Sequence, residues 1–243
     1  MIEPDRPRDL GALLRDSFNV YLGHFATFLA LGAVVVVPAE LIVSGVGLEQ
    51  LSSDYDDTPG FAEAAIPAAV AYLVVAPLTT AICVHALLAV ASGGSPGARE
   101  AIIKGLEAFT PIFFAVLLAA LGILLGLILI VPGIYLFVRW YFVPQTVVLE
   151  GARDTGALRA SGRLVEGAWW RTFGMVLLVN LLALVAAVLL GYPFAAAAEG
   201  TDRAIWSLAG QIVAAVVTQP FAALFATLLY FDLRERKRSA HAG

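Results

Sequence analysis

The sequence predicts an all-α, polytopic membrane protein with six transmembrane helices in three hairpins, each preceded by an amphipathic interfacial elbow helix. Three observations predict this class. Sixty per cent of the residues are hydrophobic and 14% are charged, whereas soluble domains carry about 25% charged residues. Six stretches carry almost no charge, and most of them reach the ~20 apolar residues that cross a ~30 Å hydrocarbon core. The Lys and Arg residues gather at alternate ends of these stretches.

The predicted transmembrane helices follow the apolar stretches in order. The third and fourth are joined by Pro132 and Gly133, which predict a tight turn because proline ends a helix and glycine accepts a positive φ. The fourth stretch is short, which places this turn at or below the membrane surface. One interrupted long helix is the alternative here. The six predicted spans are residues 25–48, 64–91, 108–131, 134–149, 172–198 and 204–231.

Basic residues predict the orientation of these spans. Thirteen of the 15 Lys and Arg residues lie before the first span or after the second, fourth and sixth. The opposite side carries Arg203, and Arg139 lies within a span. Because cytoplasmic loops are enriched in Lys and Arg, we expect both termini in the cytoplasm, with residues 232–243 as a basic tail.

A short amphipathic segment precedes each hairpin, at residues 8–22, 98–108 and 154–168. In the first segment Leu10 and Leu14 begin a series of apolar residues spaced by three and four. We expect elbow helices that lie in the headgroup plane with their apolar faces towards lipid. The alternative is that they are the first turns of long membrane helices. The residues expected at the headgroups are Arg15, Arg99, Arg159, Arg163, Trp169, Trp170 and Arg171.

Two charged side chains lie within the predicted spans. Glu40 and Arg139 each lie roughly 8–12 Å inside the outer end of their helices, at about 1.5 Å per residue. An isolated intramembrane charge costs at least ~2.5–3.5 kcal/mol, and pairing relieves much of this cost. We therefore expect a Glu40–Arg139 ion pair or a polar cavity lined by both. A scaffold salt bridge, or an Arg139 that reaches the outer headgroups, is the structural alternative.

Uncharged or weakly basic polar residues also lie within the spans. Each is expected to hydrogen-bond across a helix interface, at about 0.6–2 kcal/mol. Among them only the histidine titrates near neutral pH, which is weak support for a proton relay. The spacing of Gly122 and Gly126 favours a close helix contact. The polar candidates are His85, Gln145, Asn180 and Gln219.

The residue patterns typical of catalysis and metal binding do not occur in this sequence. The histidines His24, His85 and His241 are scattered, and there is no HExxH, CxxC, P-loop or GxSxG motif. A net charge of −4 gives no nucleic-acid footprint. An acidic run in the first outer loop is expected to be solvated rather than to bind a metal. We expect no enzyme activity, no cofactor, no metal and no nucleic-acid partner.

Three groups of residues resemble a known family. One is the segment from Pro132 to Trp140, followed by Pro144 and Glu150; the others are Ala157, Leu158, Ser161, Leu164, Gly167, Trp169, Trp170, Arg171 and Phe173, and the ending Leu229 to Arg234. Together they resemble the membrane domain associated with bacterial glycerophosphoryl diester phosphodiesterases and related uncharacterised six-span families. The resemblance implies the six-helix fold and a place in the bacterial inner membrane. It implies no hydrolysis, because in fused members that chemistry resides in a separate soluble domain.

Two functions remain open at this point. The first is a non-catalytic scaffold or accessory protein in membrane or lipid processes, with membrane lipids as partners and a membrane or cytoplasmic protein as a further candidate. Basic interfacial helices favour it, since they attract anionic lipids. The second is a small-solute or lipid transporter or channel with a polar site at Glu40 and Arg139, which buried charges at matched depth favour.

Overall fold

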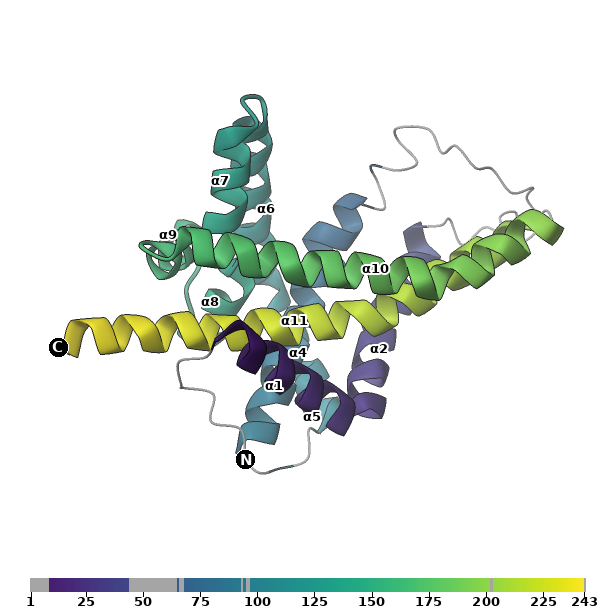
Figure 1. The fold of residues 1–243 in the computed structure, drawn as a ribbon, viewed down its shortest axis with the longest axis horizontal. Helices are drawn as coiled ribbons and strands as arrows, with labels where there is room; N and C mark the ends of the chain where they lie inside the picture. Colours follow the sequence, from purple (N-terminus) through teal and green to yellow (C-terminus); the bar gives the residue numbers. More distant parts are fainter. Residues whose placement is uncertain are drawn as a thin grey trace.

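The computed structural model describes residues 9–43, 65, 68–92, 94, 97–201 and 203–242 and contains no strand in those ranges. Its elements are helical throughout, and Figure 1 shows their arrangement. They are α1 (Leu10–Gly23), α2 (Phe25–Val43), η1 (Ala71–Val75), α4 (Ala76–Ala91), α5 (Ala98–Glu107), α6 (Phe109–Leu127), α7 (Val131–Arg139), α8 (Val143–Glu150), α9 (Asp154–Val165), α10 (Trp169–Thr201) and α11 (Ala204–Ala242).

Within the described ranges, five helices are long and apolar enough to cross a membrane. This agrees with the predicted class of multi-pass helical membrane protein. The expected first and second spans, 25–48 and 64–91, extend partly outside the described residues. The five candidate spans are Phe25–Ile42, Ala68–Ala91, Phe109–Leu127, Trp169–Thr201 and Ile205–Ala240.

The fourth expected span, residues 134–149, does not form a single helix. It is divided into α7 and α8 by a turn at residues 140–142. The cause lies in Pro144 in the first turn of α8. Proline has no backbone N–H, so it cannot donate the hydrogen bond that would continue α7 into α8. The sequence predicts a kink at Pro144, and the structure has a full break there, so residues 134–149 are not one helix.

The turn between α6 and α7 also differs from the prediction. Residues 128–130 make the turn, and Pro132 lies in the first turn of α7, where a missing N–H costs nothing. Gly133 is needed for packing: a Cβ there would lie 2.7 Å from the Leu127 Cα atom. The two helices pack against each other as a hairpin whose tip projects from the rest of the bundle (Figure 1), so the alternative of one interrupted long helix is excluded.

Short helices occupy all three positions where elbows were expected. α1, α5 and α9 each precede an apolar helix, with breaks at His24, Ala108 and residues 166–168. Gly167 takes a φ of +80° in the last of these breaks, a value that glycine adopts readily. Their position in the headgroup plane remains a prediction. The expected tail at 232–243 is not a separate segment, because α11 continues without a break to Ala242.

α11 is the central helix of the bundle. It packs against α10 along its length and also contacts α2, α4 and α1 (Figure 1). Leu224, Phe225 and Leu228 have no exposed surface. α2 approaches α11 closely, because a Cβ on Gly32 would lie 2.9 Å from the Val216 carbonyl oxygen. This core positions the elements that enclose the candidate site.

Candidate functional site

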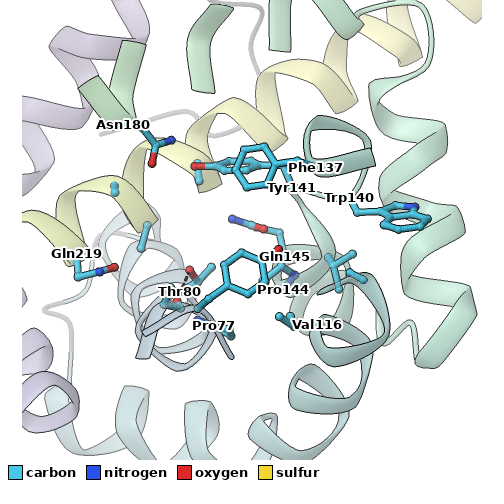
Figure 2. A pocket seen from close by; sticks show the side chains of 17 residues that line it. Pro77, Thr80, Val116, Phe137, Trp140, Tyr141, Pro144, Gln145, Asn180 and Gln219 are labelled. Carbon is cyan, nitrogen blue, oxygen red and sulfur yellow. Dashed lines mark hydrogen bonds between the residues drawn. The ribbon is translucent and has the colours of Figure 1, made fainter. Parts of the chain in front are cut away.

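A cavity of about 340 Å³ lies where the broken fourth span meets the central helices. It falls in the size range of small-molecule sites, about 300–1,000 Å³. η1, α4, α6, α7, α8, α10 and α11 all contribute side chains, several of which Figure 2 shows around the space. Its polar lining is Tyr72, Thr80, Trp140, Tyr141, Gln145, Asn180 and Gln219, and its apolar lining is mainly alanine, proline, valine and phenylalanine.

Gln145 is the most constrained polar group in this cavity. It lies in the first turn of α8 with 1% of its surface exposed. Its Oε1 atom is buried and accepts no hydrogen bond from any residue that the structure describes. A buried acceptor left unsatisfied costs about 1–3 kcal/mol, so this amide needs a donor that the described part of the chain does not supply.

The break in the fourth span points Gln145 into the cavity, and Ser161 of α9 holds that break. Ser161 Oγ donates to the Arg139 carbonyl oxygen at 2.9 Å and accepts from the Phe142 N–H at 3.2 Å. Ser161 has no exposed surface. It therefore satisfies the backbone groups on both sides of the break, which would otherwise be orphaned in an apolar interior.

Asn180 and Tyr141 form a second polar pair at the cavity. Asn180 Nδ2 donates to the Val176 carbonyl oxygen at 2.7 Å, and both Asn180 and Tyr141 line the cavity. Tyr141 packs edge-on to Phe137 at 5.9 Å between ring centroids. Aromatic rings and amides thus alternate around the space, which suits a ligand with both apolar and hydrogen-bonding parts.

No charged side chain and no histidine occurs among the described residues that line this cavity. Ions that enter a low-dielectric site need a partner of opposite charge. The lining therefore favours a neutral ligand over an ion. π-helical turns such as η1 frequently occur at functional sites, and Tyr72 of η1 lines this one.

The structure brings together three of the six intramembrane candidates that the sequence suggested. Gln145, Asn180 and Gln219 converge on the cavity. The sequence identified them as interhelical hydrogen-bonding residues, because nothing in their spacing shows that they share one space. Glu40, Arg139 and His85 do not line it.

The expected Glu40–Arg139 ion pair does not form. Arg139 donates to the Tyr135 hydroxyl at 2.8 Å, and its Nε lies 2.9 Å from where a Cβ on Gly162 would be. The guanidinium instead lies against Gly162 of α9, beside the end of α7.

His85 lies in a separate region, between α4 and α5. It lines a second cavity of about 350 Å³ with Ser92, Glu100 and Lys104. Lys104 lies 2.7 Å from Glu100, and its hydrogen bond and charge hold the pKa of Glu100 below its usual range. The Lys104–Glu100 pair is exposed to solvent. It therefore does not form part of a proton relay from His85 through the membrane helices.

Of the Arg and Trp residues expected at the headgroups, some are exposed and the others pack inside the protein. Arg15, Arg99, Arg159, Arg163 and Trp170 are exposed, as the prediction requires, although no lipid contact follows from exposure alone. Trp169 instead stacks on Phe173 at 5.3 Å and donates to the Tyr135 carbonyl oxygen.

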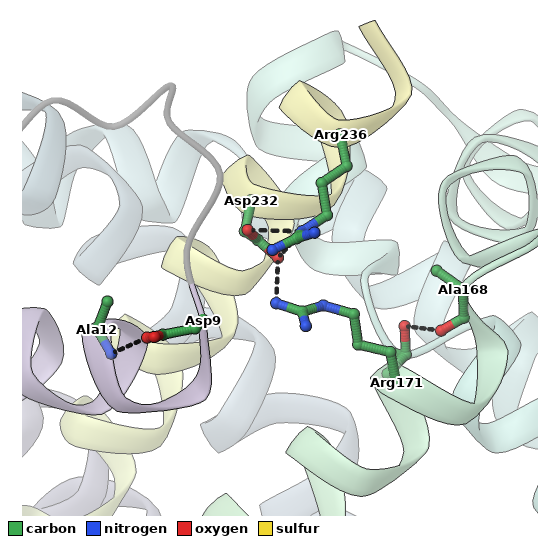
Figure 3. Close-up of polar contacts among 7 residues, drawn as sticks. Asp9, Ala12, Ala168, Arg171, Asp232 and Arg236 are labelled. Atoms are coloured by element: carbon green, nitrogen blue, oxygen red, sulfur yellow. Dashed lines mark hydrogen bonds and ion pairs between the residues drawn. The ribbon is translucent and has the colours of Figure 1, made fainter. Parts of the chain in front are cut away.

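Arg171 belongs to an ion network inside the protein. Its Nη2 lies 3.0 Å from Asp232 Oδ2, and Arg236 Nε lies 3.0 Å from Asp232 Oδ1 (Figure 3). Asp232 has no exposed surface. This network was not predicted, although the (i, i+4) spacing of Asp232 and Arg236 is a signal for half of it.

Comparisons with known proteins give one family match. A family model described as "Domain of unknown function (DUF7847)" matches residues 61–233, which include every described residue that lines the cavity. No curated protein and no solved structure matches the chain. The comparisons supply no link to the phosphodiesterase-associated membrane domains, so that resemblance remains an expectation.

Proposed function

The chain belongs to the DUF7847 family, and we propose that it is a non-catalytic membrane protein that binds an uncharged, hydrogen-bond-donating molecule within its helical bundle. The observation that carries this proposal is Gln145, whose side chain lines the cavity and whose buried Oε1 lacks a donor among the described residues. A bound hydroxyl or amide N–H would satisfy it. An accessory role in lipid processes and a transporter role both include such a binding step.

The broken fourth span supports the same proposal. In many transporters the substrate lies near the bilayer midplane beside a discontinuous helix. Here α7 and α8 meet at the cavity, and Pro77 and Pro144 lie in its wall. The transporter alternative therefore rests on this amide-lined cavity and no longer on Glu40 and Arg139.

The proposed setting is a bacterial cytoplasmic membrane with both termini inside. Five candidate spans alone would place the chain ends on opposite sides. However, α7 and α8 together return the chain from the α6 turn to α9, which restores an even number of crossings. The basic residues of α5, α9 and the end of α11 then lie on one side, as the positive-inside rule requires.

Ligand-induced stabilisation tests the binding proposal. The protein in lipid nanodiscs is titrated with neutral donors, both short (acetamide, glycerol) and long-chain (decanol, decanamide), and the midpoint of thermal unfolding is measured. We expect at least one neutral donor to raise the midpoint in the wild type and not in Gln145→Leu. The matched control is Gln211→Leu, an exposed glutamine of α11 outside the cavity. Equal responses of all three proteins to every neutral donor would contradict the proposal.

A scaffold function at the cytoplasmic face is the second candidate. It is favoured by an open trough of about 580 Å³ between α9 and α11, lined by Arg163, Arg234, Lys237 and Arg238 together with Glu150 and Glu166. If this face recruits anionic lipid, the protein should retain phosphatidylglycerol over phosphatidylcholine in native mass spectrometry. Arg163→Gln with Arg234→Gln should reduce that retention, and Arg203→Gln should not. Equal retention of the two lipids would exclude this role.

A further inference from the structure

Building on the proposed function, we infer that the cavity is entered sideways from the bilayer, and that its ligand is a lipid-like amphiphile. The uncharged head of this ligand carries a hydroxyl or amide N–H and enters the cavity. Its hydrocarbon chain stays among the surrounding lipids. The chemical class of the ligand and its route of entry from the bilayer go beyond the proposed binding function.

The outer end of the cavity lies on a lipid-facing helix surface. Asn180 lines the cavity and is exposed. Its neighbours Leu177 and Leu181 are 56% and 53% exposed. Asn180 lies eleven residues after Trp169, where α10 begins, so it is about 16 Å along the helix, near the middle of a ~30 Å hydrocarbon core. Water is absent at that depth, and the mouth therefore opens to acyl chains.

η1 and α11 also contribute to the lining. Tyr72 of η1 is 39% exposed and lines the cavity. Ala222 and Ala226 of α11 also line it, and their small side chains leave room between the helices. Figure 2 shows Asn180 and Gln219 on one side of the space and Val116 on the other, with Gln145 between them.

The inner end of the cavity is closed and carries the unsatisfied acceptor. Val116, Ala119 and Val143 are at most 4% exposed, and Gln145 is 1% exposed. A ligand that enters past Asn180 therefore meets the Gln145 amide last. The polar group must lead and the chain must trail, because a leading hydrocarbon chain would leave Gln145 Oε1 without a donor.

The charge of the lining selects the head group. The described lining residues carry no cation to pair with a phosphate or carboxylate and no anion to pair with an amine. A charged head would have to lose its hydration without compensation. The side-chain amides and tyrosine hydroxyls of the lining can both donate hydrogen bonds to a neutral hydroxyl or amide and accept them from it.

Photolabelling in nanodiscs tests this inference. The probes are a long-chain alcohol and the corresponding alkyl phosphate, each with a diazirine on the carbon next to the head, and labelled peptides are quantified by mass spectrometry. We expect the alcohol to label the peptide from Phe137 to Gln145 above the lipid-facing background measured on residues 181–189. Labelling of that peptide should fall about fivefold in Gln145→Leu, the factor for one ordinary hydrogen bond.

Two further variants complete the test. Ala222→Phe places a bulky ring at the mouth and should reduce labelling even if Gln145→Leu does not fold, whereas Gln211→Leu should leave it unchanged. Equal labelling by alcohol and phosphate would overturn the neutral head. If acetamide or glycerol stabilises the protein through Gln145 and the alcohol fails to label, lipid entry is wrong and the proposed function stands. If no neutral donor acts through Gln145, both fall.

Discussion

At the scale of single residues, the polar candidates could be found from the sequence but their grouping could not. Gln145, Asn180 and Gln219 are recognisable because amides are rare in apolar stretches. Their convergence depends on a break that changes the direction of the chain at residues 140–142. The expected Glu40–Arg139 pair failed for another reason: similar depth along two helices does not bring their side chains together, and Arg139 lies against Gly162 of α9.

Asp232 provides a test at this scale. Asp232→Asn removes the carboxylate that joins Arg171 of α10 to Arg236 of α11. We expect a loss of about 3 kcal/mol in the free energy of unfolding, the lower end for a broken buried pair, because both guanidinium groups are partly exposed. The measurement is SDS-induced unfolding in mixed micelles.

The matched control for this variant is Glu235→Gln. Glu235 lies three residues after Asp232 on the same helix. Its carboxylate is 3.6 Å from the Arg238 guanidinium, and both side chains are partly exposed. Such surface pairs contribute at most about 1 kcal/mol. An Asp232→Asn protein that unfolds no more easily than Glu235→Gln would show that the network does not stabilise the bundle.

At the scale of elements, the sequence predicted where helices occur better than where they end. Short helices occur where elbows were expected, and apolar helices follow the apolar stretches. Gly122 and Gly126 make close contacts, with the Trp140 ring and with α7 respectively. The α6–α7 turn was misplaced, and Pro144 indicated a kink where the structure has a full break. Proline is compatible both with a turn and with the first turn of a helix, so its presence alone does not decide between them.

The α6–α7 hairpin depends on glycine at its contact. A Cβ on Gly126 would lie 2.9 Å from the Gly133 backbone nitrogen. Gly126→Ala should therefore push the helices apart and lower the free energy of unfolding by about 1–3 kcal/mol. Gly174→Ala on α10, where nothing lies within 4 Å, is the control and should be neutral or stabilising. A Gly126→Ala protein as stable as wild type would contradict this contact.

The tip of this hairpin is expected to stay within hydrocarbon. Ile128, Leu129 and Val131 are 76%, 72% and 74% exposed and carry no polar side chain. The turn also satisfies its own N–H groups, since those of residues 129–131 donate to carbonyl oxygens of residues 126, 127 and 129. A backbone satisfied in this way can remain inside a bilayer.

Thiol accessibility tests the depth of the tip. Cys83 is the single cysteine and is buried, so Cys83→Ala gives a background for Ile130→Cys. A membrane-impermeant maleimide should not label Ile130→Cys in intact membranes from either side. Ser239→Cys, which is exposed near the end of α11, is the control and should be labelled from the cytoplasmic side. Rapid labelling of Ile130→Cys from outside would show that the turn emerges into water.

At the scale of the whole molecule, composition and charge decided the class and suggested the orientation. Helices long enough to span the membrane confirm the class. The orientation remains a prediction, because a helical bundle alone does not show which end faces the cytoplasm. Hydropathy does not locate the break in the fourth span, because the turn at residues 140–142 is as apolar as the stretches around it.

Protease protection tests the orientation. Tags fused to the two chain ends should both be resistant to protease in right-side-out vesicles and both be removed in inverted vesicles. A tag inserted after Thr201, between α10 and α11, should behave in the opposite way. If the terminal tags differ from each other, the return of the chain through α7 and α8 is wrong.

The most direct test of the central claim is density in the cavity of the protein purified in native lipids and imaged by cryo-electron microscopy. We predict elongated non-protein density with one end about 3 Å from Gln145 Oε1, at hydrogen-bonding distance, and the other beyond Asn180 among the lipids. A chain of ordered waters from Gln145 to an aqueous surface, or a Gln145 side chain that turns away to a protein donor, would contradict the account.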